Sequence, residues 1–116
     1  MKAQDLYIAE QPVMSLVEGV CVRPGMYTLN GTLEEAAAFL EGFYSGMASH
    51  NLSEGAVQEV TWWSEFCKWA CEQLGNSQSG WYGVFRSLRS KYSDDSDAFG
   101  RLAELCLRYR RDRAAG

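Results

Sequence analysis

The apolar residues between Leu33 and Met47 constrain the fold most, because they recur at the spacing of one helical face. Thr32 precedes them and Glu35 follows three residues later, which is the capping-box pattern that begins a helix. The sequence therefore predicts a central amphipathic helix with a single buried face. The residues of this face are Leu33, Ala36, Ala37, Leu40, Phe43, Tyr44 and Met47.

Two turn signals precede the central helix. Pro24 disfavours helical geometry at Arg23, so an earlier helix should end there and Pro24-Gly25 should form a turn. Asn30-Gly31 predicts a second turn. Within the helix, Gly42 and Gly46 lie off the apolar face. These two glycines fit either a weakened surface face or the close approach of another backbone.

Helical spacing also predicts elements on both sides of the central helix. Residues 13–22 predict a short helix, although the β-prone run 20–22 leaves a short strand as the alternative. Residues 53–74 predict a long helix that ends at the C-cap Gly75. The helix expected over residues 81–92 is followed by one that begins at Asp94.

These elements together predict a single compact all-α domain of four to five helices. A chain of 116 residues corresponds to one domain and can bury about two-thirds of its unfolded surface. We expect residues 1–10 to form a loosely docked N-terminal arm and residues 110–116 to form a frayed tail. The side chains expected to share the core are Leu40, Phe43, Trp63, Phe85 and Leu102.

The four cysteines are expected to be reduced and buried. Residues 1–10 contain no long apolar run, so we expect no signal peptide and a cytoplasmic protein. Cys67 and Cys71 lie one helical turn apart and, with Cys106 and His50, make a conceivable metal-ligand set. The usual Cys-x-x-Cys spacing is missing, which favours apolar core cysteines over a metal site. No cofactor is expected.

Catalytic motifs are absent from the sequence. The single histidine, His50, falls in a predicted loop, and no nucleophile motif or Walker-type phosphate loop is present. Helix capping already explains the paired carboxylates Glu34 and Glu35. We therefore expect a binding protein rather than an enzyme, although acid–base pairs assembled only in space would not be visible in a sequence.

Charge divides the chain into an acidic part and a basic part. The net charge is −4, but ten acidic and only three basic residues precede Arg86, whereas eight basic and five acidic residues follow from there. The acidic part would suit a basic protein, and the basic end could contact phosphates. The arginines that could make this alternative nucleic-acid contact are Arg86, Arg89, Arg108, Arg110, Arg111 and Arg113. The overall negative charge favours a protein partner.

Two tryptophans are the candidate partner-binding residues. Trp62 and Trp69 lie two helical turns apart, on the side of their helix away from its main apolar face. Gln58, Glu65 and Glu72 share that side. Tryptophan is enriched at binding hot spots, so this side could be an exposed aromatic and acidic patch. Alternatively, the short first helix or the N-terminal arm covers both rings.

The segment from Arg23 to Phe43 resembles small bacterial proteins known mainly as uncharacterised open reading frames. Their pattern is Arg-Pro-x-Met-Tyr, a short glycine-containing link, and a helix ending Phe-Leu-x-Gly-Tyr. The matching residues are Arg23, Pro24, Met26, Tyr27, Phe39, Leu40, Gly42 and Phe43, where Phe43 replaces the usual tyrosine. Further similarity lies at Leu74-Gly75, at Ser79-Gly80-Trp81 and in the acidic stretch from Asp94 to Asp97.

Some proteins of this kind belong to bacterial conflict systems as immunity-like inhibitors. The resemblance therefore implies a stoichiometric inhibitor, in the first place an immunity protein that neutralises a cognate toxin. A phage-encoded inhibitor of a bacterial defence system would have the same physical properties. The last helix of the resembling proteins tends to stay acidic, whereas this one ends in arginines. The resemblance therefore does not extend to the identity of the partner.

Overall fold

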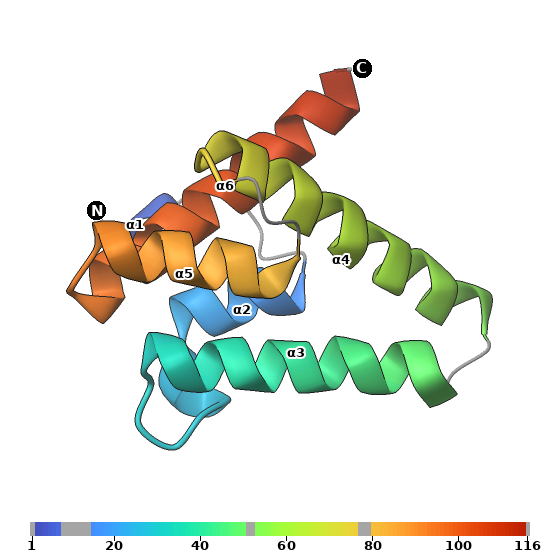
Figure 1. Ribbon diagram of the computed structural model, residues 1–116, viewed down its shortest axis with the longest axis horizontal. Helices are drawn as coiled ribbons and strands as arrows, with labels where there is room; N and C mark the ends of the chain where they lie inside the picture. Colours follow the sequence, from blue (N-terminus) through green and yellow to red (C-terminus); the bar gives the residue numbers. More distant parts are fainter. Residues whose placement is uncertain (1, 8–14, 51–52, 77–79, 116) are drawn as a thin grey trace.

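The computed structural model describes residues 2–7, 15–50, 53–76 and 80–115. Figure 1 shows α3 along one side of the molecule and α5 between α3 and the paired helices α4 and α6. In order, the elements are α1 (Ala3–Leu6), α2 (Leu16–Val22), the 3-10 turn η1 (Pro24–Met26), α3 (Leu33–His50), α4 (Glu54–Gln73), α5 (Trp81–Lys91) and α6 (Asp95–Ala115).

The described residues contain helices and no strand, which confirms the predicted all-α class. Residues 20–22 are helical, so the alternative strand there is wrong. The described residues form one α-helix more than the predicted maximum of five. The additional helix is α1, which lies within the predicted N-terminal arm. Instead of being loosely attached, α1 packs against α2 and α6, and its Ala3 side chain is buried.

The helix ends follow the local sequence signals. The Glu35 N–H donates to Thr32 Oγ1 at 3.1 Å and the Thr32 N–H donates to Glu35 Oε1 at 3.3 Å, which completes the predicted capping box. Gly75 has φ +73°. It ends α4 in a Schellman motif, in which the Asn76 N–H donates to the Cys71 carbonyl at 2.9 Å.

Two helices extend further than predicted. Helix α3 continues to His50, through a segment that the sequence analysis assigned to a loop. Helix α6 is regular through Ala115, although fraying was predicted from residue 110. The side chain of Arg110 pairs with Glu18 on α2, and this tertiary contact holds the last turns of α6 against the domain.

The core contains buried side chains from all of the helices α1 to α6, and it differs from the prediction at its edges. Leu40, Trp63 and Leu102 are buried as predicted, and Phe85 is partly buried. The prediction that Phe43 is buried is wrong, because 40% of its surface is exposed. It lies at the edge of the apolar face of α3. Phe66 of α4, which was not among the predicted core residues, is fully buried.

The glycines Gly42 and Gly46 lie on an open surface of α3. A Cβ atom added at either position would meet nothing within 4 Å. The interpretation that another backbone approaches these glycines is therefore wrong. The alternative, that they lie on a surface face of the helix, is correct.

Candidate protein-binding surface

Helix α6 covers the side of α4 that carries Trp62 and Trp69. Trp62 stacks on Phe66 with ring centroids 5.2 Å apart, and Trp69 lies 5.2 Å from the ring of Tyr109 on α6. Both tryptophans are partly buried against the core. Tyr109 of α6 thus covers part of both rings, and Trp62 shares a pocket with Ser15 and Glu18 at the start of the first predicted helix. Residues 8–10 of the predicted arm lie outside the described residues. These contacts give both rings a structural role.

The polar residues predicted around these tryptophans are differently placed. Glu65 pairs with Arg113 of α6 at 2.6 Å, whereas Gln58 and Glu72 are exposed. The acidic and aromatic patch is therefore partly closed by basic side chains of the last helix. Arg108 adds to this closure, because its guanidinium lies 5.6 Å from the centre of the Trp69 ring.

Most of the candidate nucleic-acid arginines make contacts within the molecule. Arg89 bridges Glu34 and Asp95, and these contacts raise the pKa of its guanidinium. Arg108 donates to Gln73 at 3.2 Å. As described above, Arg110 pairs with Glu18 and Arg113 with Glu65. Arg86 and Arg111 are exposed. Two of the six arginines lie on α5 and four on the last turns of α6.

A buried ionic cluster joins the N-terminal helices to α6. Glu18 is fully buried and accepts hydrogen bonds from Tyr7 Oη at 2.6 Å, Ser15 Oγ at 2.9 Å and Arg110 Nη2 at 2.9 Å. Sequence patterns alone did not predict this cluster. The Ser-x-x-Glu spacing of Ser15 and Glu18 is itself a capping-box signal. It could have predicted the contact between Ser15 and Glu18, but not the contacts of Glu18 with Tyr7 and Arg110. Burial and the bond to Glu18 raise the pKa of Tyr7.

All four cysteines are free and buried. Burial raises the pKa of the Cys21, Cys67 and Cys106 thiols, which keeps them protonated and weakly reactive. Across the described residues, no group of three or more His, Cys, Asp or Glu side chains could hold a metal ion. The side chain of His50, the fourth residue of the conceivable ligand set, lies outside that description.

Three of the large exposed apolar side chains, Met26, Tyr27 and Leu29, lie on and just after η1. Leu29 is 89% exposed and Met26 70% exposed, which is unusual for residues of their size. The ring of Tyr27 lies 5.9 Å from Phe39 on α3, and Phe39 lies 6.3 Å from Phe43. We call this group the turn–α3 surface; it comprises Met26, Tyr27, Leu29, Phe39 and Phe43.

The backbone beneath this surface is held by hydrogen bonds. Thr28 Oγ1 donates to the Pro24 carbonyl at 2.9 Å and accepts from the Gly31 N–H at 2.9 Å. The Asn30 N–H donates to Glu35 Oε1 at 2.9 Å, which ties the turn to the first turn of α3. The apolar side chains therefore project from a preorganised turn, which lowers the entropy lost when a partner binds.

No protein-family model, curated protein or solved structure matches the chain. Among the described helices, none has the length and apolar character needed to cross a membrane.

Proposed function

We propose that this domain is a stoichiometric protein-binding inhibitor and that the turn–α3 surface is its partner-binding site. The carrying observation is a row of three aromatic rings, Tyr27, Phe39 and Phe43, beside the exposed Met26 and Leu29 of a hydrogen-bonded turn. An exposed apolar patch is typical of interaction sites, because it lowers solubility and does not stabilise the isolated domain. Tyr27 and Phe43 supply aromatic contact area of the kind enriched at interface centres.

The resemblance to small bacterial proteins supports the same surface. Of its residues, Met26, Tyr27 and Phe43 are exposed on the turn–α3 surface, and Gly42 is exposed on α3. Leu40, Leu74 and Trp81 of the resemblance are buried. The resemblance thus includes both core residues and residues of the turn–α3 surface. We therefore extend the proposal to the role that the resemblance implies, an immunity protein that neutralises a cognate bacterial toxin.

Charge supports a basic protein as the partner. The net charge of −4 would accelerate association with a basic protein through long-range attraction. A phage-encoded inhibitor would use the same surface and the same charge, so it remains within the proposal. Nucleic-acid binding is less well supported, because Arg89, Arg110 and Arg113 already bind carboxylates of this chain.

The test is capture of a partner from the native host with matched variants. Leu29→Glu and Phe43→Glu place a charge on the turn–α3 surface, and Tyr82→Glu is the control, because Tyr82 is 64% exposed on α5. In Figure 1, α5 and the η1 turn lie on opposite sides of α3. We expect the wild type and Tyr82→Glu to capture one basic protein that both surface variants lose. Because Leu29 is 89% exposed, Leu29→Glu should not unfold the domain. Failure of this variant to capture the partner would therefore report on binding.

The immunity role is tested with the captured protein. Produced alone in a bacterium, it should arrest growth, and co-production of the wild type should restore growth while Leu29→Glu should not. A captured set unchanged by both surface variants would contradict the binding site. A captured protein without toxicity would contradict the immunity role and leave the binding site standing.

A further inference from the structure

A cavity of about 400 Å³ lies between α3, α4 and the start of α5, partly open to solvent. Its α3 wall consists of Glu41, Ser45 and Ala48, spaced at i, i+4 and i+7 on one face of the helix. Phe39 and Phe43 lie on another face, so the cavity is separate from the turn–α3 surface. Its volume falls in the range of small-molecule sites, about 300–1,000 Å³.

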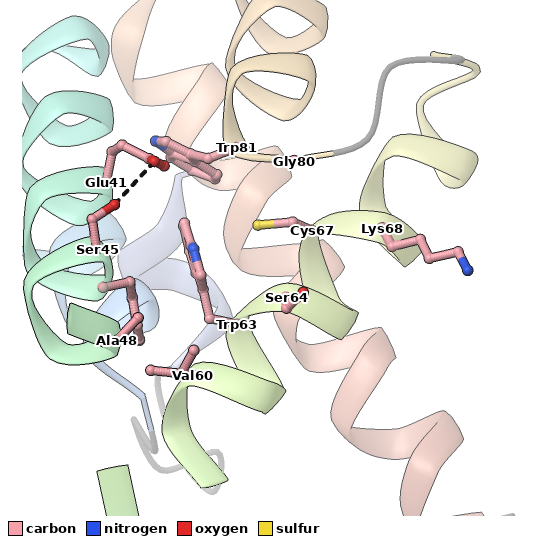
Figure 2. A pocket seen from close by; sticks show the side chains of 11 residues that line it. Glu41, Ser45, Ala48, Val60, Trp63, Ser64, Cys67, Lys68, Gly80 and Trp81 are labelled. Carbon is pink, nitrogen blue, oxygen red and sulfur yellow. Dashed lines mark hydrogen bonds between the residues drawn. The ribbon is translucent and has the colours of Figure 1, made fainter. Parts of the chain in front are cut away.

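Aromatic rings form the inner wall of the cavity. Tyr44 stacks on Trp63 with centroids 4.3 Å apart and planes within 6°, and Trp63 lies 5.0 Å from Trp81. The Trp81 indole N–H donates to the carbonyl of Ala37 at 2.9 Å, which fixes the position of that ring. Figure 2 shows Glu41 and Ser45 of α3 across the cavity from Trp63 and Val60 of α4. The wall is therefore apolar and preorganised.

One polar group of this wall is left unsatisfied. Tyr44 Oη is buried and has no hydrogen-bond partner in the described part of the chain. Its burial also raises the pKa of Tyr44, so the hydroxyl stays neutral. An unsatisfied buried hydroxyl costs about 1–3 kcal/mol.

Charge selects the kind of ligand. Among the described residues that line the cavity, Glu41 is the one carboxylate and Lys68 the one base. Glu41 accepts a hydrogen bond from Ser45 Oγ at 3.2 Å at the cavity wall, whereas Lys68 extends away from the cavity in Figure 2. The cavity thus combines a negative charge with aromatic rings, the combination that binds organic ammonium groups.

We propose that this cavity binds a small organic cation, an ammonium group on an apolar body. The ammonium would pair with Glu41, and the apolar body would lie against Trp63 and Trp81. Both interactions use side chains that the fold already holds in place. The site is independent of the proposed protein binding, because it lies on a different face of α3.

Titration with 2-phenylethylamine, followed by the NMR signals of the tryptophan indole N–H groups, tests this proposal. We expect saturable shifts of the Trp63 and Trp81 signals, with a dissociation constant in the millimolar range or below. The Trp62 and Trp69 signals should not move. 3-Phenylpropionate has a similar size and the opposite charge, so it should not bind.

Glu41→Gln should weaken binding of 2-phenylethylamine roughly tenfold or more, as expected for loss of a charged partner. Glu72→Gln is the matched control, because Glu72 is an exposed carboxylate of α4 that does not line the cavity. Thermal unfolding should show that both variants fold. The proposal would be overturned by the absence of saturable shifts, by equal binding of 3-phenylpropionate, or by equal affinities of the two variants.

Discussion

Replacing Arg110 with methionine is expected to destabilise the fold by about 3–5 kcal/mol, because it leaves the Glu18 carboxylate buried without its cation. The pair joins Arg110 Nη2 to Glu18 Oε2 at 2.9 Å, and Glu18 has no exposed surface. The pair also ties α6 to α2, while Tyr7 connects α1 to the same carboxylate at 2.6 Å. Loss of the cation should therefore loosen three helices together. Chemical denaturation measures the change.

The matched control is the next residue along α6. Arg111 is exposed, so Arg111→Met should change stability by no more than about 0.5 kcal/mol. The double variant Glu18→Met/Arg110→Met should recover much of the loss, because no unpaired charge then remains in the core. Equal stabilities of Arg110→Met and Arg111→Met would show that the buried ion pair does not hold α6.

Phe66→Ala is expected to cost about 3–5 kcal/mol of folding stability, the range for removal of a buried phenylalanine. Phe66 is fully buried on α4, and its ring meets Trp62 at 5.2 Å and Tyr109 at 5.5 Å. Its removal would leave a cavity between α4 and α6 and withdraw the support of Trp62. Thermal or chemical unfolding would measure the loss.

Phe43→Ala is the comparison, because it removes the same ring from an exposed position on α3. We expect a loss of less than about 1 kcal/mol there. If Phe43→Ala destabilised the protein as much as Phe66→Ala, Phe43 would belong to the core. The turn–α3 surface would then lose one of its three aromatic rings.

The sequence predicted the helices from α2 to α6 and most of their ends, because these depend on neighbouring residues, whereas α1 was not predicted. The capping box of Thr32 and Glu35 is complete within three residues, and Gly75 ends α4 with its own positive φ. Helical spacing also identified Leu40 and Leu102 as core residues. Local signals of this kind do not depend on how the helices are arranged in space.

The candidate site could not be predicted in the same way. Helical spacing places Phe43 and Phe66 at the edges of apolar faces, and only the positions of neighbouring helices decide which edge is covered. The partner of Glu18 lies 92 residues along the chain. Trp62 and Trp69 also depended on a tertiary contact, since the packing of α6 covers their side of α4.

Site-specific photocrosslinking most directly tests the claim that the turn–α3 surface binds a protein. A benzophenone amino acid in place of Leu29 would project from the surface without disturbing the core, because Leu29 is 89% exposed. The same amino acid in place of Tyr82 would report on α5 at a comparably exposed position. Irradiation in the native host should join one discrete protein to the chain from position 29 and none from position 82. A discrete adduct from position 82 alone, or from neither position, would contradict the proposed binding surface.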